Sequence, residues 1–276
     1  MGDLSPVIFI SRILIPLTLL LPHLKVTTME HNLALCLREG TQQSHTLAEN
    51  TAYMKCFLKG IVEKEPFRQL LANLYFVYSA LEDAIRRHAQ HAVVGPMYFP
   101  LLERVSPLEK DLAFYYGANW RDEIVPSPQG QHYVERIHTL ADQEPALLVA
   151  HSYVRYIGDL SGGQGLRAVV RSALKLPDGD GTAFYEFDNL PSVDARQVFK
   201  GIYRNALNSL PIETSVVQKI VDEANLAFQL NRNVMHDLEP LVKDAVGDQV
   251  FEQITRQERP GSTEHHHRSS GLLSAT

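Results

Sequence analysis

Residues 158–165, GDLSGGQG, place four glycines and one aspartate within eight positions. Apolar residues at helical spacing flank this stretch on both sides, over 147–156 and 166–174. A glycine inside a helix costs about 1 kcal/mol relative to alanine, so the four together cost roughly 3–4 kcal/mol. Some other interaction must offset that cost, and identifying it decides how the rest of the chain is interpreted.

Three explanations of the glycines compete. A phosphate-binding loop would need a strand before it and a lysine after it, and the sequence has neither here. Close packing on a second helix would use Gly158 and Gly162, which stand one turn apart. A flat ligand lying on the helix would also need the missing side chains, and a glycine pair can kink a helix. The neighbouring Asp159 would then have to be hydrated or paired.

The body of the chain reads as helix. Apolar residues recur at helical spacing from Met29 to about Gln253, and strand-like alternation is almost absent. The pattern predicts one all-α domain, a helical bundle whose ligand site lies between facing helices. The predicted helices span 31–49, 66–90, 106–117, 130–140, 146–174, 194–208, 213–236 and 238–254.

Composition and the two ends of the chain set further limits. The formal net charge of −6 argues against nucleic acid as a partner, and two cysteines form no disulfide framework. Residues 1–28 are an apolar extension broken by Arg12, Pro16 and Pro22, and we expect them to lie upstream of the true start. A membrane anchor or a removed targeting segment are the alternatives. The domain then covers 29–256, and the polar tail 257–276, with its three consecutive histidines, is predicted to be disordered.

A flat ligand needs an anchor, and His45 is the candidate. It shares a helical face with small and apolar residues, which suits a pocket wall, although a partly buried core histidine would look the same. Glu49, one turn later, is positioned to partner the ring. Glu135 and His138 form the single internal ExxH pair, whereas a di-iron bundle site would need two such pairs and two more glutamates. The residues that share the face of His45 are Leu33, Leu37, Thr41, Ser44 and Ala48.

Four segments together resemble heme oxygenase. They are LREGTQQSHTLAEN (37–50), AHSYVRYIGDLSGGQ (150–164), FKGIYRNALNSL (199–210) and EANLAFQLNRNVM (223–235). The resemblance runs in order over roughly residues 32–250, and GDLSGGQ is very specific to that family. It is greatest to the soluble cyanobacterial and algal-plastid branch.

The resemblance implies a heme sandwiched between a proximal helix and a glycine-kinked distal helix. His45 matches the proximal ligand of the heme iron, a role that neutral imidazole suits. Asp159 matches the residue that holds the distal water network, on the helix that carries Gly158, Gly162 and Gly163. Arg38, Tyr153, Lys200 and Arg204 match positions that meet the heme propionates, and Arg155, Phe228 and Asn231 match further pocket positions.

The resemblance also implies the reaction. Heme b would be both substrate and cofactor, and dioxygen would open its ring to biliverdin, with the alpha isomer expected, releasing carbon monoxide and ferrous iron. Reduced ferredoxin would supply the electrons and dock near Arg155, Lys200 and Arg204. The product would feed phycobilin synthesis through a downstream bilin reductase. No firm membrane association is expected, and the location would be the cytoplasm or, in an alga, the plastid stroma.

Three other functions stay open at this point. A heme carrier without turnover would share His45 but would not need Asp159 or the glycine pair. A helical enzyme of similar architecture, such as a thiaminase-like relative, would not need His45 together with GDLSGGQ, although a fold alone does not fix a function. A purely structural bundle would leave Arg38, Lys200 and Arg204 unexplained.

Overall fold

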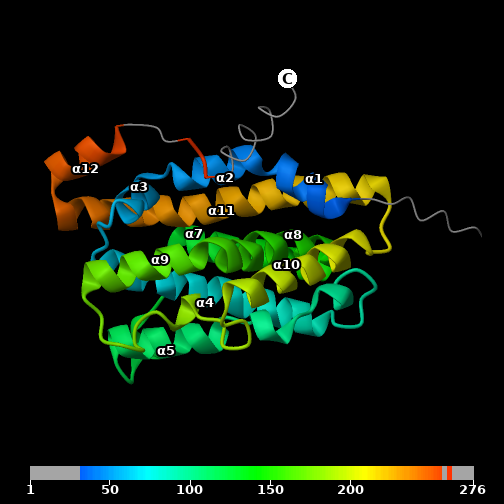
Figure 1. Cartoon of the computed structure of the whole chain (residues 1–276), viewed down its shortest axis with the longest axis horizontal. Helices are drawn as coiled ribbons and strands as arrows, with labels where there is room; N and C mark the ends of the chain where they lie inside the picture. Colours follow the sequence, from blue (N-terminus) through cyan, green and yellow to red (C-terminus); the bar gives the residue numbers. More distant parts are fainter. Residues whose placement is uncertain (1–31, 257–259, 263–276) are drawn as a thin grey trace, which may run out of the picture.

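A computed structural model describes residues 32–256 and 260–262, and within them the chain forms helices and no strands (Figure 1). The helices lie roughly along the long axis of the molecule, which confirms the predicted all-α bundle. The α-helices are α1 (Leu33–Gly40), α2 (Gln42–Glu49), α3 (Ala52–Leu58), α4 (Lys64–Arg87), α5 (Val105–Tyr116), α6 (Trp120–Glu123), α7 (Pro128–Gln143), α8 (Leu148–Ser152), α9 (Gly158–Leu174), α10 (Val193–Asn208), α11 (Thr214–Val246) and α12 (Asp248–Thr255).

The long helices α4 and α11 form the centre of the packing. Helix α4 packs against α5 and α7, while α11 crosses α4 and α7 and also meets α1, α2, α3 and α8. The apolar stripe read from the sequence of α4 is buried, with Phe67, Leu71 and Leu81 fully enclosed. Burial of these faces is the main favourable contribution to folding. Helix α2 packs on α11, whereas α9 packs on α3 and on the short turn Ala183–Tyr185.

The glycine-bearing helix is continuous but irregular in an unexpected place. Between α8 and α9 the backbone widens into a π-helical turn, Tyr153–Ile157, which ends directly before Gly158. A π turn accommodates one extra residue and often marks a functional site. The sequence predicted a kink at the glycines, whereas the irregularity of the backbone lies one turn before Gly162.

Two predicted boundaries were wrong. The predicted helix 31–49 is broken at Thr41 into α1 and α2. The break predicted between 236 and 238 does not occur, because α11 continues through Pro240 as far as Val246. Pro240 is exposed, so water can satisfy the carbonyl that loses its helical hydrogen bond.

The ends of the chain lie mostly outside the described residues. The predicted extension 1–28 is outside them, as is most of the tail that begins at Gln257. Residues 260–262 of that tail are described, and Ser262 donates two hydrogen bonds to Glu49 on α2. Among the described helices, none is long and apolar enough to cross a bilayer.

A buried polar cluster fixes α8, the segment that leads into the π turn. Glu223 of α11 is 4% exposed and accepts hydrogen bonds from His151 Nε2 at 2.9 Å and from Arg136 Nε at 3.0 Å. Burial alone would raise the pKa of Glu223, but these hydrogen bonds outweigh it and lower the pKa to about 2. The cluster therefore ties α7, α8 and α11 together through one ionised carboxylate.

Replacing Glu223 with glutamine should destabilise the protein at neutral pH and weaken its pH dependence. Folding lowers the pKa of this carboxyl from about 4.5 to about 2, which adds about 3 kcal/mol to the free energy of unfolding at pH 7. That contribution is complete above about pH 5 and is lost as the pH falls toward 2. Urea unfolding should show Glu223→Gln about 3 kcal/mol less stable at pH 7, with the difference shrinking at lower pH.

The matched control is Asp222→Asn, which changes the exposed neighbouring carboxylate on the same helix. It should leave the free energy of unfolding nearly unchanged at every pH. A deficit of equal size for Glu223→Gln at pH 7 and at pH 3 would contradict the assignment.

Candidate functional site

Asp159, the acid of the glycine stretch, belongs to a buried network of polar side chains. Its carboxylate accepts a hydrogen bond from the Tyr78 hydroxyl of α4 and lies 3.6 Å from the guanidinium of Arg155, one turn earlier. Arg155 also donates from Nε to the Tyr78 hydroxyl at 3.1 Å and from Nη1 to Asn231 Oδ1 at 2.7 Å. Helices α4 and α11 and the π turn thus meet at one acid.

Burial governs the charge of this network. Desolvation raises the pKa of Asp159 above the usual range of an aspartate, while Arg155 and the Tyr78 hydrogen bond oppose that rise. Burial also holds the pKa of Tyr78 well above 10, so the phenol keeps its proton and acts as a donor. An acid with a raised pKa beside a fixed cation is suited to exchanging protons closer to neutral pH.

The glycines present a face without side chains. A Cβ added at Gly158, Gly162 or Gly165 would find no described atom within 4 Å, and all three residues are exposed. Gly163 faces a different neighbour, since its added Cβ would lie 3.4 Å from the Tyr185 ring. Close packing of two helices therefore does not explain Gly158, Gly162 and Gly165. They leave open space along α9, next to the buried Asp159.

His45 stands on α2 with its ring partly open to solvent. Its side chain is 33% exposed, and the ring meets Phe228 of α11 edge to face at 5.7 Å. Its Nδ1 atom is buried and has no hydrogen-bond partner among the described residues. Glu49 Oε2 lies 3.8 Å away, which is too long for a hydrogen bond. The imidazole is thus oriented by packing and is free to bind something else.

Helix α11 connects the two halves of the site. Phe228 contacts His45, and Asn231, three residues later, accepts a hydrogen bond from Arg155. Residues three apart lie on the same face of a helix. The imidazole of α2 and the acid of α9 therefore flank one face of α11, as required of two helices that enclose a flat molecule.

A cluster of positive charge lies at one end of this arrangement. Burial and the nearby charges of Arg204 and Arg196 lower the pKa of Lys200. Burial raises the pKa of Tyr153 in the π turn, and the positive charges of Arg38 and Arg204 partly oppose that rise. Among the described residues Arg38, Lys200 and Arg204 pair with no carboxylate. Clustered cations without a partner indicate a site for an anionic group.

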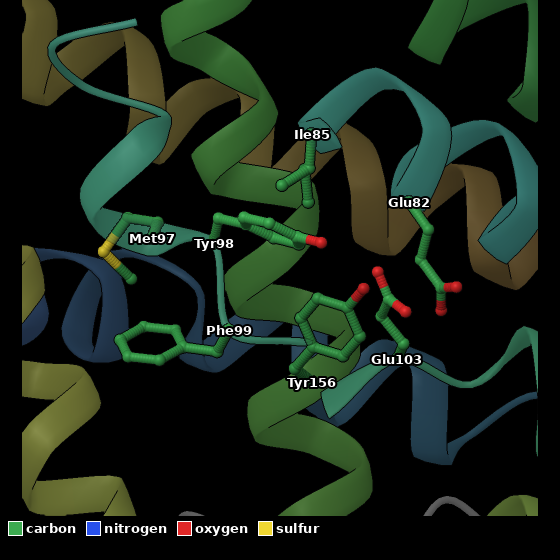
Figure 2. Close-up of a pocket in the computed structure, with 7 residues that line it drawn as sticks. All are labelled: Glu82, Ile85, Met97, Tyr98, Phe99, Glu103 and Tyr156. Carbon is green, nitrogen blue, oxygen red and sulfur yellow. The ribbon is translucent and has the colours of Figure 1, made fainter. Parts of the chain in front are cut away.

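A small cavity lies between α4, the π turn and the segment that precedes α5. Figure 2 shows the Tyr98 and Tyr156 hydroxyls turned toward the carboxylates of Glu82 and Glu103. Burial raises the pKa of Glu82 to about 7. The cavity has room for about one water molecule, so it does not hold the flat ligand. It is lined by Glu82, Ile85, Met97, Tyr98, Phe99, Glu103 and Tyr156.

The structure brings together most of the residues selected from the sequence, with two corrections. Arg155 is only 9% exposed and is held by Tyr78 and Asn231, so it does not reach a surface where a protein partner could dock. Glu49 lies beside His45 but directs its carboxylate to Ser262 instead. Tyr78 was missed because it reads as a core residue, although a buried tyrosine hydroxyl needs a partner, and that was the available signal.

Comparisons with known proteins point to one family. The family model described as heme oxygenase matches residues 31–237. Heme oxygenase 2 of Synechocystis is 61% identical over 84% of this chain and 93% of its own length, and the heme oxygenase of Rhodella violacea is 46% identical over 83% and 97%. The crystal structure of Synechocystis heme oxygenase-2 with heme and NO aligns with a TM-score of 0.84, covering 85% of this chain and 96% of that one.

Replacing Gly162 with alanine should stabilise the protein that carries no ligand. The added methyl group meets open space, and alanine favours helix over glycine, so we expect a gain of about 1 kcal/mol in the free energy of unfolding. Gly117→Ala is the contrasting variant: its φ of 90° disfavours alanine, which should destabilise. Chemical denaturation measures both, and a loss of stability in Gly162→Ala would restore the packing explanation.

Proposed function

The chain belongs to the heme oxygenase family and cleaves heme, and we propose that it forms the alpha isomer of biliverdin, carbon monoxide and ferrous iron from heme b, dioxygen and electrons of reduced ferredoxin. The observation that carries the proposal is the buried Asp159 beside the open glycine face, with His45 on the other side of α11. When bound, heme supplies both the iron that activates dioxygen and the ring that is oxidised.

The residues of the site fit a heme. We assign His45 as the proximal ligand, because its imidazole is partly open while Phe228 packs against its ring. Gly158, Gly162 and Gly163 belong to the distal helix, where the first two leave a face along which a flat ring can lie against backbone. The cations of Arg38, Lys200 and Arg204, with Tyr153 beside them, suit the two propionates and would fix which edge of the ring faces inward.

Asp159 is proposed to control proton delivery. The Tyr78 hydroxyl and Arg155 hold its carboxylate in place, and Asn231 holds Arg155 in turn. With heme bound, a carboxylate held in this way would supply protons from a fixed position through water. That role would favour oxidation of the ring over other reactions of the activated dioxygen.

The electron donor is proposed to dock on the exposed side of α10. Arg204 is exposed there and Lys200 is half-buried, whereas the exposed Val198 and Ile202 lie on another face of the same helix. A basic surface of this kind suits an acidic partner such as ferredoxin. The product is proposed to feed phycobilin synthesis ahead of a bilin reductase, in the cytoplasm or a plastid stroma.

Heme titration followed by turnover tests the proposal. We expect ferric heme to bind one to one with a histidine-type Soret spectrum, and His45→Ala to lose that spectrum because it lacks the iron ligand. Reduced ferredoxin in air should then bleach the complex to a biliverdin band, at a rate that falls as salt rises. An unchanged spectrum in His45→Ala would overturn the ligand assignment, and binding without bleaching would indicate a heme carrier.

Asp159→Ala should separate heme binding from ring opening. The variant keeps His45 and the glycine face, so its heme affinity should stay close to that of the unmodified protein. Without the acid that directs proton delivery, the yield of biliverdin should collapse and peroxidase-like oxidation of an added phenol should appear. A normal biliverdin yield, measured by absorbance after extraction, would refute the role of Asp159.

A further inference from the structure

The chain returns to the proximal helix after α12. Helix α12 packs on α3, where the buried Lys55 donates from Nζ to the Thr255 carbonyl at 3.1 Å. Residues 260–262 then lie against α2, drawn red in Figure 1. Gly261 is buried there, and a Cβ on it would stand 2.0 Å from Thr46 Oγ1. Only glycine permits this approach, one residue away from His45.

Ser262 engages both oxygens of Glu49. Its backbone N–H donates to Oε2 at 2.8 Å, and its hydroxyl donates to Oε1 at 2.6 Å. A carboxylate held through both oxygens by neighbouring donors on one residue has a fixed orientation. The orientation of Glu49 is therefore set by residues 260–262.

His45, one turn earlier on α2, forms no hydrogen bond with the Glu49 carboxylate. His45 Nδ1 is buried and lacks a hydrogen-bond partner among the described residues, although Glu49 Oε2 is only 3.8 Å away. That oxygen is the one that accepts the backbone N–H of Ser262. Glu49 is thus close enough to serve the ring after a small rotation, and the hydrogen bonds to Ser262 oppose that rotation.

We propose that Ser262 is a positioning residue that keeps Glu49 from accepting a hydrogen bond from His45, and so limits how strongly His45 donates to the heme iron. The proposal rests on the proposed role of His45 as iron ligand. A carboxylate that accepts from the distant nitrogen of a ligating imidazole makes that imidazole a stronger donor. A stronger donor favours the oxidised iron, so withholding Glu49 makes the iron easier to reduce by an external electron donor.

The test compares two variants of the full-length heme complex. Ser262→Ala removes the hydroxyl donor, and Gly261→Ala should displace both donors because its methyl group collides with Thr46. Ser262→Ala leaves only the backbone N–H on Oε2, and Gly261→Ala removes both hydrogen bonds, so Glu49 can turn toward His45 partly in the first variant and freely in the second. Resonance Raman spectra of the ferrous complex should show the iron–histidine stretch at higher frequency, more so in Gly261→Ala, and the iron reduction potential should fall in the same order.

Two further variants make the test specific. Ser106→Ala removes an exposed serine hydroxyl on α5 and should shift neither quantity. Repeating Ser262→Ala and Gly261→Ala in a Glu49→Ala background should abolish both shifts, because the acceptor is then gone. Shifts that persist without Glu49, or spectra that do not change in either single variant, would overturn the proposal.

His45→Ala distinguishes this outcome from failure of the proposed function. If the iron–histidine band of the unmodified protein disappears in His45→Ala, the ligand is assigned whatever Ser262 does. If the band is present in His45→Ala, the ligand assignment fails and the role of Ser262 fails with it.

Discussion

A guanidinium inside a protein must be paired, and the distal half of this site depends on how Arg155 meets that requirement. Its partners are Tyr78 on α4, Asn231 on α11 and Asp159 one turn ahead. Arg155 fixes each of these partners in turn. If any one of them moved away, the buried guanidinium would lose a hydrogen bond, which is energetically unfavourable. The hydrogen bonds and the ion pair of Arg155 and Asp159 therefore fix the position of the N-terminal end of α9.

This constraint explains how a helix that carries so many glycines can be held in place. At Gly158, Gly162 and Gly165 it gives up side-chain packing, and it also gives up helix propensity. Hydrogen bonds of the Glu223 cluster hold α8, which precedes α9. The network around Arg155 holds the π turn and the first two residues of α9, Gly158 and Asp159. Binding surface and helix stability are thus supplied by different parts of the same continuous helix.

The sequence predicted the parts of the site that depend on local pattern. Glycines in a helical context, and a histidine on a small-residue face, identified α9 and α2 before any contact was known. Contacts between segments far apart in the chain could not be predicted from the sequence. The spacing of Tyr78 is that of any core residue, and no residue near Glu49 predicts its hydrogen bonds to Ser262. The break predicted between 236 and 238 does not occur, because the packing of α11 against several helices holds it together as far as Val246, and such packing is a property of the fold.

The two helices of the site are held with unequal strength. Helix α2 has no side-chain cap at its start, and Ala48 is its one residue classed as buried. Its polar tie to α11 is the partly buried hydrogen bond from Ser44 Oγ to Asn225 Oδ1 at 2.6 Å. Helix α9 is anchored at its start by the largely buried charges of Asp159 and Arg155 instead. Since local stability follows buried contacts, α2 should open locally more readily than the start of α9, where Asp159 and Arg155 are held.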